Sequence, residues 1–179
     1  MKLIALRCPS CNNALAPGDD DLVIACEQCG AGVAIDDDGL HPIDLRCAVS
    51  EAPAAQYQPW WVFEGRVQLN RRETQSGNRR EEALKFWAQP RSFFVPAWEL
   101  SLQALKQDGL DMLKKQPQLS AGARPAQLRL APVVVSAEDA RRMLELLVLP
   151  LEAGRDDWLK TIDFKVEVGE PVLWALSNS

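Results

Sequence analysis

The stretch WWVFEGRVQL, residues 60–69, places apolar side chains at alternating positions over most of its length. These apolar positions are Trp61, Phe63, Val67 and Leu69. The period of two predicts a half-buried strand, because successive side chains of a strand point to opposite faces of a sheet. The same geometry puts the indoles of Trp60 and Trp61 on opposite faces. Only one of them can face the core, so the other must be covered by a helix, a neighbouring domain or a partner.

The residues that follow this stretch predict two more strands and a helix. Turn-forming residues at 76–78 separate the first strand from expected strands at 84–87 and 93–95, which together would make an antiparallel meander. Large apolar residues at helical spacing over 98–105 then predict a helix, and we expect Gly109 to end or break it.

The next segment predicts a strand followed by a helix. A short buried strand is expected at 133–135. Ser136 and Asp139 then resemble a capping box, with Asp in place of the usual Glu. Apolar residues over 140–147 form one helical face, and Pro150 is expected to stop this helix.

The last part of the chain predicts a hairpin. Apolar and charged residues alternate strictly over 162–168, and Gly169-Glu170 can turn the chain into a final strand at 172–176. The expected order of elements over residues 60–179 is therefore β-β-β-α-β-α-β-β. This order predicts an α+β domain with a mainly antiparallel sheet.

The N-terminal part of the chain differs in charge from the rest. Through Cys47 there are eight acidic and three basic side chains, which account for the whole net charge of −5. The segment 47–59 is rich in Ala, Pro and Gln and has no periodicity, which indicates a linker. We therefore expect a small domain at 1–46 and the α+β domain at 60–179.

Four of the 5 cysteines form two Cys-x-x-Cys pairs, Cys8 with Cys11 and Cys26 with Cys29. Two cysteines separated by two residues can both reach one ion, and two such knuckles close a tetrahedral shell of four sulfurs. A redox dithiol needs only one exposed pair. Iron also suits four tetrahedral thiolates and stays an alternative metal. Because a closed shell leaves no open position for water, catalysis by the metal is disfavoured.

The pattern C-x2-C-x14-C-x2-C, with Pro9 inside the first knuckle and Gly30 after the second, resembles the zinc-ribbon family over residues 3–46. The resemblance implies that the four paired cysteines bind one structural Zn²⁺ within a small β ribbon. His41 is the sole histidine, and we expect it to be an ordinary loop or strand residue of that ribbon. Cys47 has no partner in a Cys-x-x-Cys pair and is expected to be a linker or surface thiol.

Length and composition indicate a soluble globular protein. The chain has 179 residues, of which 47% are hydrophobic and 25% charged. It has no run of about 18 apolar residues that would cross a membrane. The apolar patch at its N-terminus is too short for an export signal. We therefore expect a cytoplasmic protein, in a reducing compartment where paired cysteines more often hold metal than form disulfides.

No sequence motif names a reaction. The chain lacks a glycine-rich phosphate loop, a G-x-S-x-G elbow and an H-E-x-x-H helix. We therefore expect a non-enzymatic adaptor or assembly subunit that binds a protein partner. Its contact surface would include the exposed member of the Trp60–Trp61 pair together with Arg71 and Arg72, since Trp and Arg are enriched in binding hot spots.

The alternative function is that of a nucleic-acid-associated regulatory protein that uses the arginine-rich hairpin expected at 66–91. The small N-terminal domain is too acidic for this role, because its carboxylates would repel a phosphate backbone. An enzyme of an unrecognised type is the third hypothesis, since carboxylate active sites can lack any sequence signature.

Overall fold

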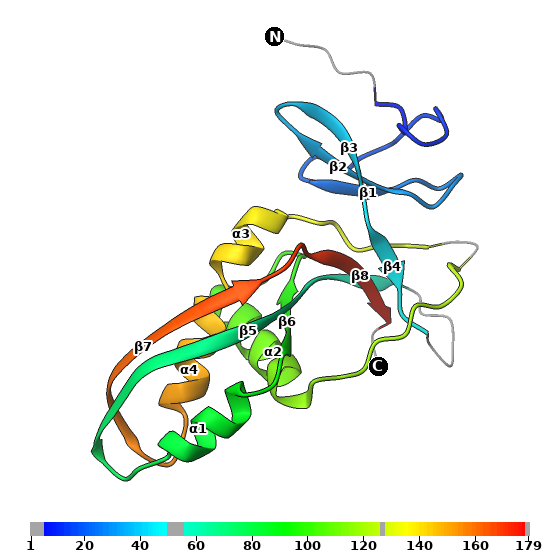
Figure 1. Cartoon of the computed structure of the whole chain (residues 1–179). Helices are drawn as coiled ribbons and strands as arrows, with labels where there is room; N and C mark the ends of the chain where they lie inside the picture. The colour runs from blue at the N-terminus through cyan, green and yellow to red at the C-terminus, as the bar shows by residue number, and fades with distance from the viewer. Residues whose placement is uncertain (1–5, 50–55, 126–127, 178–179) are drawn as a thin grey trace.

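The computed structural model describes residues 6–49, 56–125 and 128–177, and it has the predicted α+β class with mostly antiparallel sheets (Figure 1). The smaller sheet contains β1 (Val23–Ala25), β2 (Gly32–Asp36) and β3 (Gly39–Ile43). The larger sheet contains β4 (Leu45–Cys47), β5 (Tyr57–Ser76), β6 (Arg91–Pro96), β7 (Trp158–Val168) and β8 (Val172–Ser177). The helices are α1 (Arg80–Trp87), α2 (Leu102–Lys115), α3 (Ala137–Arg142) and α4 (Glu145–Ala153). None of the helices in the described ranges combines the length and the apolar character needed to cross a membrane.

Strand β5 is the element around which the larger sheet is built, because β6, β7 and β8 all pair with it. The predicted strand at 60–69 is confirmed as part of this 20-residue strand. Along one edge, β6 pairs with residues 60–65 of β5. Along the other edge, β8 pairs with residues 57–62 and β7 with residues 65–76 (Figure 1).

The predicted hairpin between the last two strands is wrong. Strands β7 and β8 do not pair with each other; both run antiparallel to β5, one after the other along the same edge. Val168 of β7 lies opposite Gly65, and Val172 of β8 lies opposite Val62. The short segment 169–171 therefore interrupts an otherwise nearly continuous pairing along this edge of β5. The alternation of side chains had identified both strands correctly, but it carries no information about which strand each of them meets.

Helix α1 occupies the place where the sequence predicted a strand at 84–87, and that prediction is wrong. Ala83 and Trp87, four residues apart, are both buried, so the segment buries one face of a helix. A short apolar run fits either a strand or a helix, and here packing against β5 decides for the helix. The order from β5 onward is therefore β-α-β-α-α-α-β-β instead of the predicted one.

Two predicted helix ends are also wrong. Gly109 is buried inside α2, where a Cβ would lie 2.7 Å from Leu147 Cδ2 and 3.0 Å from the carbonyl oxygen of Phe94. Glycine therefore allows α2 to approach α4 and β6 closely. Pro150 lies inside α4, and its carbonyl oxygen accepts a helical hydrogen bond from the Gly154 N–H at 2.9 Å.

Both faces of the larger sheet are covered around Trp60 and Trp61, and this accounts for the two adjacent indoles. Trp61 is 3% exposed in the main core, and its Nε1 donates to the Val135 carbonyl oxygen at 2.8 Å. Trp60 is 7% exposed on the opposite face and makes edge-to-face contacts with Phe94 and Trp98. The prediction that one member of this pair is exposed for a partner is therefore wrong.

Two features connect the smaller sheet to the rest of the structure. One is the direct continuation of β3 into β4, and the other is Val23. Strand β3 leads through Asp44 directly into β4, which pairs in parallel with β8. Val23 belongs to the main core and forms an isolated bridge with Val133. The prediction of a buried strand at 133–135 is therefore wrong, since this segment forms only that isolated bridge among the described residues.

The predicted linker at 47–59 begins and ends within strands. Cys47 is the last residue of β4, and residues 57–59 open β5; residues 50–55 lie outside the described residues. Cys47 is 6% exposed, so its prediction as a linker or surface thiol is wrong. The division into domains at 1–46 and 60–179 stays a prediction.

The close approach at Gly109 yields a test of this packing. Gly109→Ala is expected to lower the free energy of unfolding, because overpacking costs about 1–3 kcal/mol, more than the roughly 1 kcal/mol that Ala gains over Gly in a helix. Urea unfolding followed by circular dichroism measures the change. Gln103→Ala, at an exposed position of the same helix, is the control and should shift stability by less than about 0.5 kcal/mol. A Gly109→Ala protein more stable than the wild type would contradict the described contact.

Candidate metal centre

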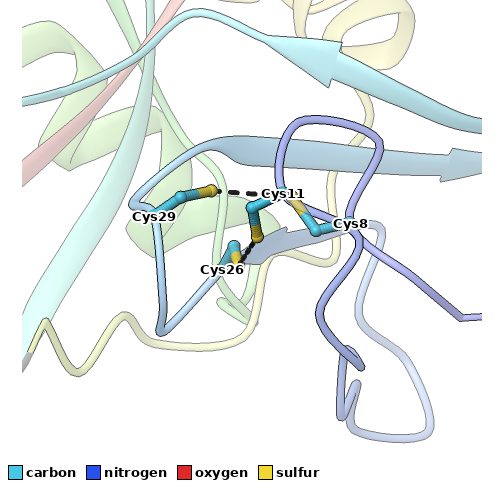
Figure 2. Close-up of side chains that lie close together, drawn as sticks. All are labelled: Cys8, Cys11, Cys26 and Cys29. Carbon is cyan, nitrogen blue, oxygen red and sulfur yellow. Dashed lines mark hydrogen bonds between the residues drawn. The ribbon is translucent and has the colours of Figure 1, made fainter.

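Two equivalent turns bring the paired cysteines together (Figure 2). In the first, the Asn12 N–H donates to the Cys8 carbonyl oxygen at 2.8 Å; in the second, the Gly30 N–H donates to the Cys26 carbonyl oxygen at 2.9 Å. Asn12 and Gly30 both adopt a left-handed backbone, with φ of 62° and 85°. Asparagine and glycine tolerate this conformation best, which explains why they follow the two knuckles. The cysteines of the cluster are Cys8, Cys11, Cys26 and Cys29.

The four sulfurs have the spacing of a tetrahedral metal shell. All four Sγ atoms lie within 4.8 Å of one another. Each sulfur of the first knuckle faces one of the second, with Cys8 to Cys29 and Cys11 to Cys26 both at 3.6 Å. A metal–sulfur distance of about 2.3 Å corresponds to tetrahedral sulfur–sulfur edges of about 3.8 Å. All four are free thiols, so the donor set fits one tetrahedral ion.

The thiols differ in how readily they lose a proton. The backbone amide of Asn13, followed by its side-chain amide, lowers the pKa of Cys11 to about 6. The amide of Ala31 favours the thiolate of Cys29, but the Cys11 sulfur, desolvation and the Cys8 sulfur together outweigh it and raise the pKa of Cys29 to about 12. Four thiolates so close together repel one another, and a divalent cation removes that repulsion.

The other two residues considered with the ribbon lie outside this cluster. His41 is half exposed in β3, where its Nε2 lies 3.1 Å from Asp36 Oδ1, so its prediction as an ordinary strand residue is confirmed. Cys47 is buried in the larger sheet, and burial raises the pKa of its thiol. A neutral buried thiol is a poor metal ligand.

Arg72, predicted to lie on the surface that contacts a partner, belongs instead to a buried cluster of charges. Its Nε donates to Glu152 Oε2 at 2.8 Å, and its Nη1 and Nη2 donate to the Asp157 carboxylate at 2.6 and 2.7 Å. The Arg72 guanidinium holds the pKa of Asp157 below its usual value. Glu152 is fully buried and also accepts a hydrogen bond from Trp87 Nε1. Arg71, the neighbouring residue, is exposed as predicted.

The arginine-rich stretch 66–91 is not a hairpin, since it comprises the end of β5, helix α1 and the start of β6. Several of its cations already have acidic partners, as Arg71 has with Glu73 at 2.7 Å and Arg79 with Glu82 at 3.6 Å. These ion pairs reduce the charge available to a phosphate backbone. The nucleic-acid alternative therefore gains no support from this surface.

Sequence reasoning missed two residues of interest. Trp158, at the start of β7, is 67% exposed and lines a cavity of about 630 Å³ together with Arg155 and Asp156. Arg124 reaches the second knuckle and donates from Nη2 to the Cys26 carbonyl oxygen at 3.0 Å. Arg124 and Cys26 are 98 residues apart in the chain, so no local pattern could have signalled this contact.

Comparisons of this chain with protein-family models, curated proteins and solved structures found no match.

The buried cluster around Arg72 predicts a sharp difference between neighbouring arginines. Arg72→Ala is expected to cost about 3–5 kcal/mol of stability, because it removes the guanidinium that pairs with the buried Asp157 carboxylate and one of the two arginines that pair with Glu152. Arg71→Ala removes an exposed ion pair and should cost less than about 1 kcal/mol. Urea unfolding of both variants beside the wild type measures this, and equal losses would contradict the assignment of Arg72 to the buried cluster.

Proposed function

We propose that Cys8, Cys11, Cys26 and Cys29 bind one Zn²⁺ and that residues 3–46 form a zinc ribbon. The observation that carries this proposal is the set of four Sγ atoms within 4.8 Å of one another, held by two equivalent turns. Zinc commonly occupies closed four-thiolate shells of this kind in proteins. The absence of aromatic residues between the two pairs argues against a rubredoxin-like iron site.

The role of the ion in this proposal is structural. Among the described residues, the buried apolar cluster around the cysteines is small and consists of Cys8, Leu15, Cys26 and Val33. So small a core provides little hydrophobic stabilisation, and metal binding would contribute the rest of the free energy of folding. Four protein sulfurs fill a tetrahedral shell, which leaves no position for a substrate or an activated water.

We further propose that the protein is a non-enzymatic adaptor or assembly subunit of the cytoplasm. A reducing compartment suits an unpaired set of thiols. Because Trp60, Trp61 and Arg72 are buried, we place the proposed contact surface at the exposed Trp158 instead. An exposed indole beside a cavity offers a large apolar anchor with few rotatable bonds, which is typical of interface hot spots.

Metal analysis of protein purified without added metal tests the zinc assignment. One equivalent of zinc per chain is expected, and Cys26→Ser should lose most of it, because three sulfurs bind the ion far more weakly than four. Cys47→Ser is the matched control and should keep its zinc, since Cys47 lies outside the cluster. A full equivalent of iron, or disulfides between the pairs in a reduced preparation, would contradict the assignment.

The adaptor proposal is tested by affinity capture from the native cell with variants that differ only at the surface. Trp158→Ser should reduce recovery of a stoichiometric partner at least tenfold with no change in melting temperature. Leu102→Ser is the control, because Leu102 is 55% exposed at the start of α2. Equal capture by all three proteins would contradict the proposal. Tight binding of duplex DNA or RNA at physiological salt, lost on Arg71→Glu, would favour the nucleic-acid alternative.

A further inference from the structure

Arg124 carries an unusual polar atom. Among the residues that the structure describes, its Nη1 is the buried side-chain nitrogen or oxygen that lacks a hydrogen-bond partner. Nη2 of the same guanidinium donates to the Cys26 carbonyl oxygen at 3.0 Å. A buried, charged donor without an acceptor is strongly unfavourable, so its presence calls for a partner of opposite charge at this place.

The unpartnered nitrogen lies against the second cysteine knuckle. A Cβ built on Gly30 would be only 2.2 Å from Nη1, so the guanidinium fills the space that this glycine leaves free. Arg124, Gly30 and Cys29 line the same cavity of about 290 Å³. The described residues that line this cavity include no carboxylate, but they include Cys29, one of the four clustered cysteines.

The metal-bound cysteines would supply the missing charge. Four thiolates around one divalent ion carry a net charge of −2, which attracts a nearby cation. Resting on the zinc site proposed above, we propose that Arg124 is a positioning residue of this site. It balances the charge of the metal–thiolate shell and fixes the second knuckle through the Cys26 carbonyl.

The same residue links the metal site to the larger sheet. Ala121 forms a bridge with Ala48, and the Gly122 N–H donates to the Cys47 carbonyl oxygen at 2.9 Å. Cys47 ends β4, which pairs with β8. The segment 121–124 therefore contacts the knuckle at one end and β4 at the other, and Ala121, Gly122 and Arg124 line one cavity together with the buried Cys47. Metal binding and the covering of Cys47 are thereby coupled, and such coupling is reciprocal.

Metal affinity provides the first test. Co²⁺ and Zn²⁺ dissociation constants are measured by competition with a chromophoric chelator for the wild type, Arg124→Ala, Arg124→Lys and Arg46→Ala. Arg124→Ala should weaken binding about 10–100-fold, the usual effect of losing an outer partner of a metal ligand. The metal affinity of Arg124→Lys should lie between those of the wild type and Arg124→Ala, because lysine keeps the positive charge but lacks the planar guanidinium. Arg46→Ala is the matched control, since Arg46 lines the same cavity but pairs with Asp44 at 2.6 Å.

Cys47 provides the second, independent readout. Iodoacetamide labelling of the zinc-loaded proteins, followed by mass spectrometry, should modify Cys47 at least tenfold faster in Arg124→Ala than in the wild type or in Arg46→Ala. If Arg124→Ala does not fold, the same two measurements on Arg124→Lys decide, with smaller changes in the same direction.

The outcomes separate the two proposals. A wild type that binds neither Zn²⁺ nor Co²⁺ would overturn the zinc site and the role of Arg124 together. A wild type that binds zinc, with Arg124 variants unchanged in affinity and in Cys47 labelling, would overturn the role of Arg124 alone. If Arg46→Ala changed metal affinity and Cys47 labelling as much as Arg124→Ala does, the specific role of Arg124 would also be overturned. Any cation that lines the cavity would then have the same effect.

Discussion

Backbone pairing along β5 is the constraint on which the rest of the structure depends. Because β5 has 20 residues, it can pair with β6 along one edge and with both β7 and β8 along the other. Strand β8 in turn holds β4, which follows directly from the smaller sheet. The position of the cysteine knuckles relative to the larger sheet is thus fixed by a series of strand pairings that starts at β5.

The second determinant is the pairing of charged groups that are buried or partly buried. The larger part of the protein buries Arg72 with Glu152 and Asp157, where each charged group has a partner of opposite sign. At the knuckles, four thiols lie within 4.8 Å of one another, and the Nη1 of Arg124, next to Gly30 of the second knuckle, lacks an acceptor. A divalent ion would satisfy both needs, since it allows the thiols to ionise and leaves a net negative shell facing Arg124.

Some patterns that are local in sequence predicted the correct element, whereas pairings between distant segments could not be predicted. The alternation around Phe63 and the spacing of the cysteines each identified the correct local structure. Gly109 was misjudged because its role is to admit Leu147 from another helix, which no local pattern reveals. Arg72 was misjudged for the same reason, as its acidic partners lie 80 or more residues further along the chain.

The central claim is that four thiolates hold one tetrahedral zinc ion. X-ray absorption at the zinc edge, on the full-length protein as purified, measures the ligand set directly. Four sulfur neighbours at about 2.3 Å, with no nitrogen or oxygen in the shell, are the predicted result. A shell with fewer than four sulfurs, or with bound water or imidazole, would contradict the closed structural site and the role given to it.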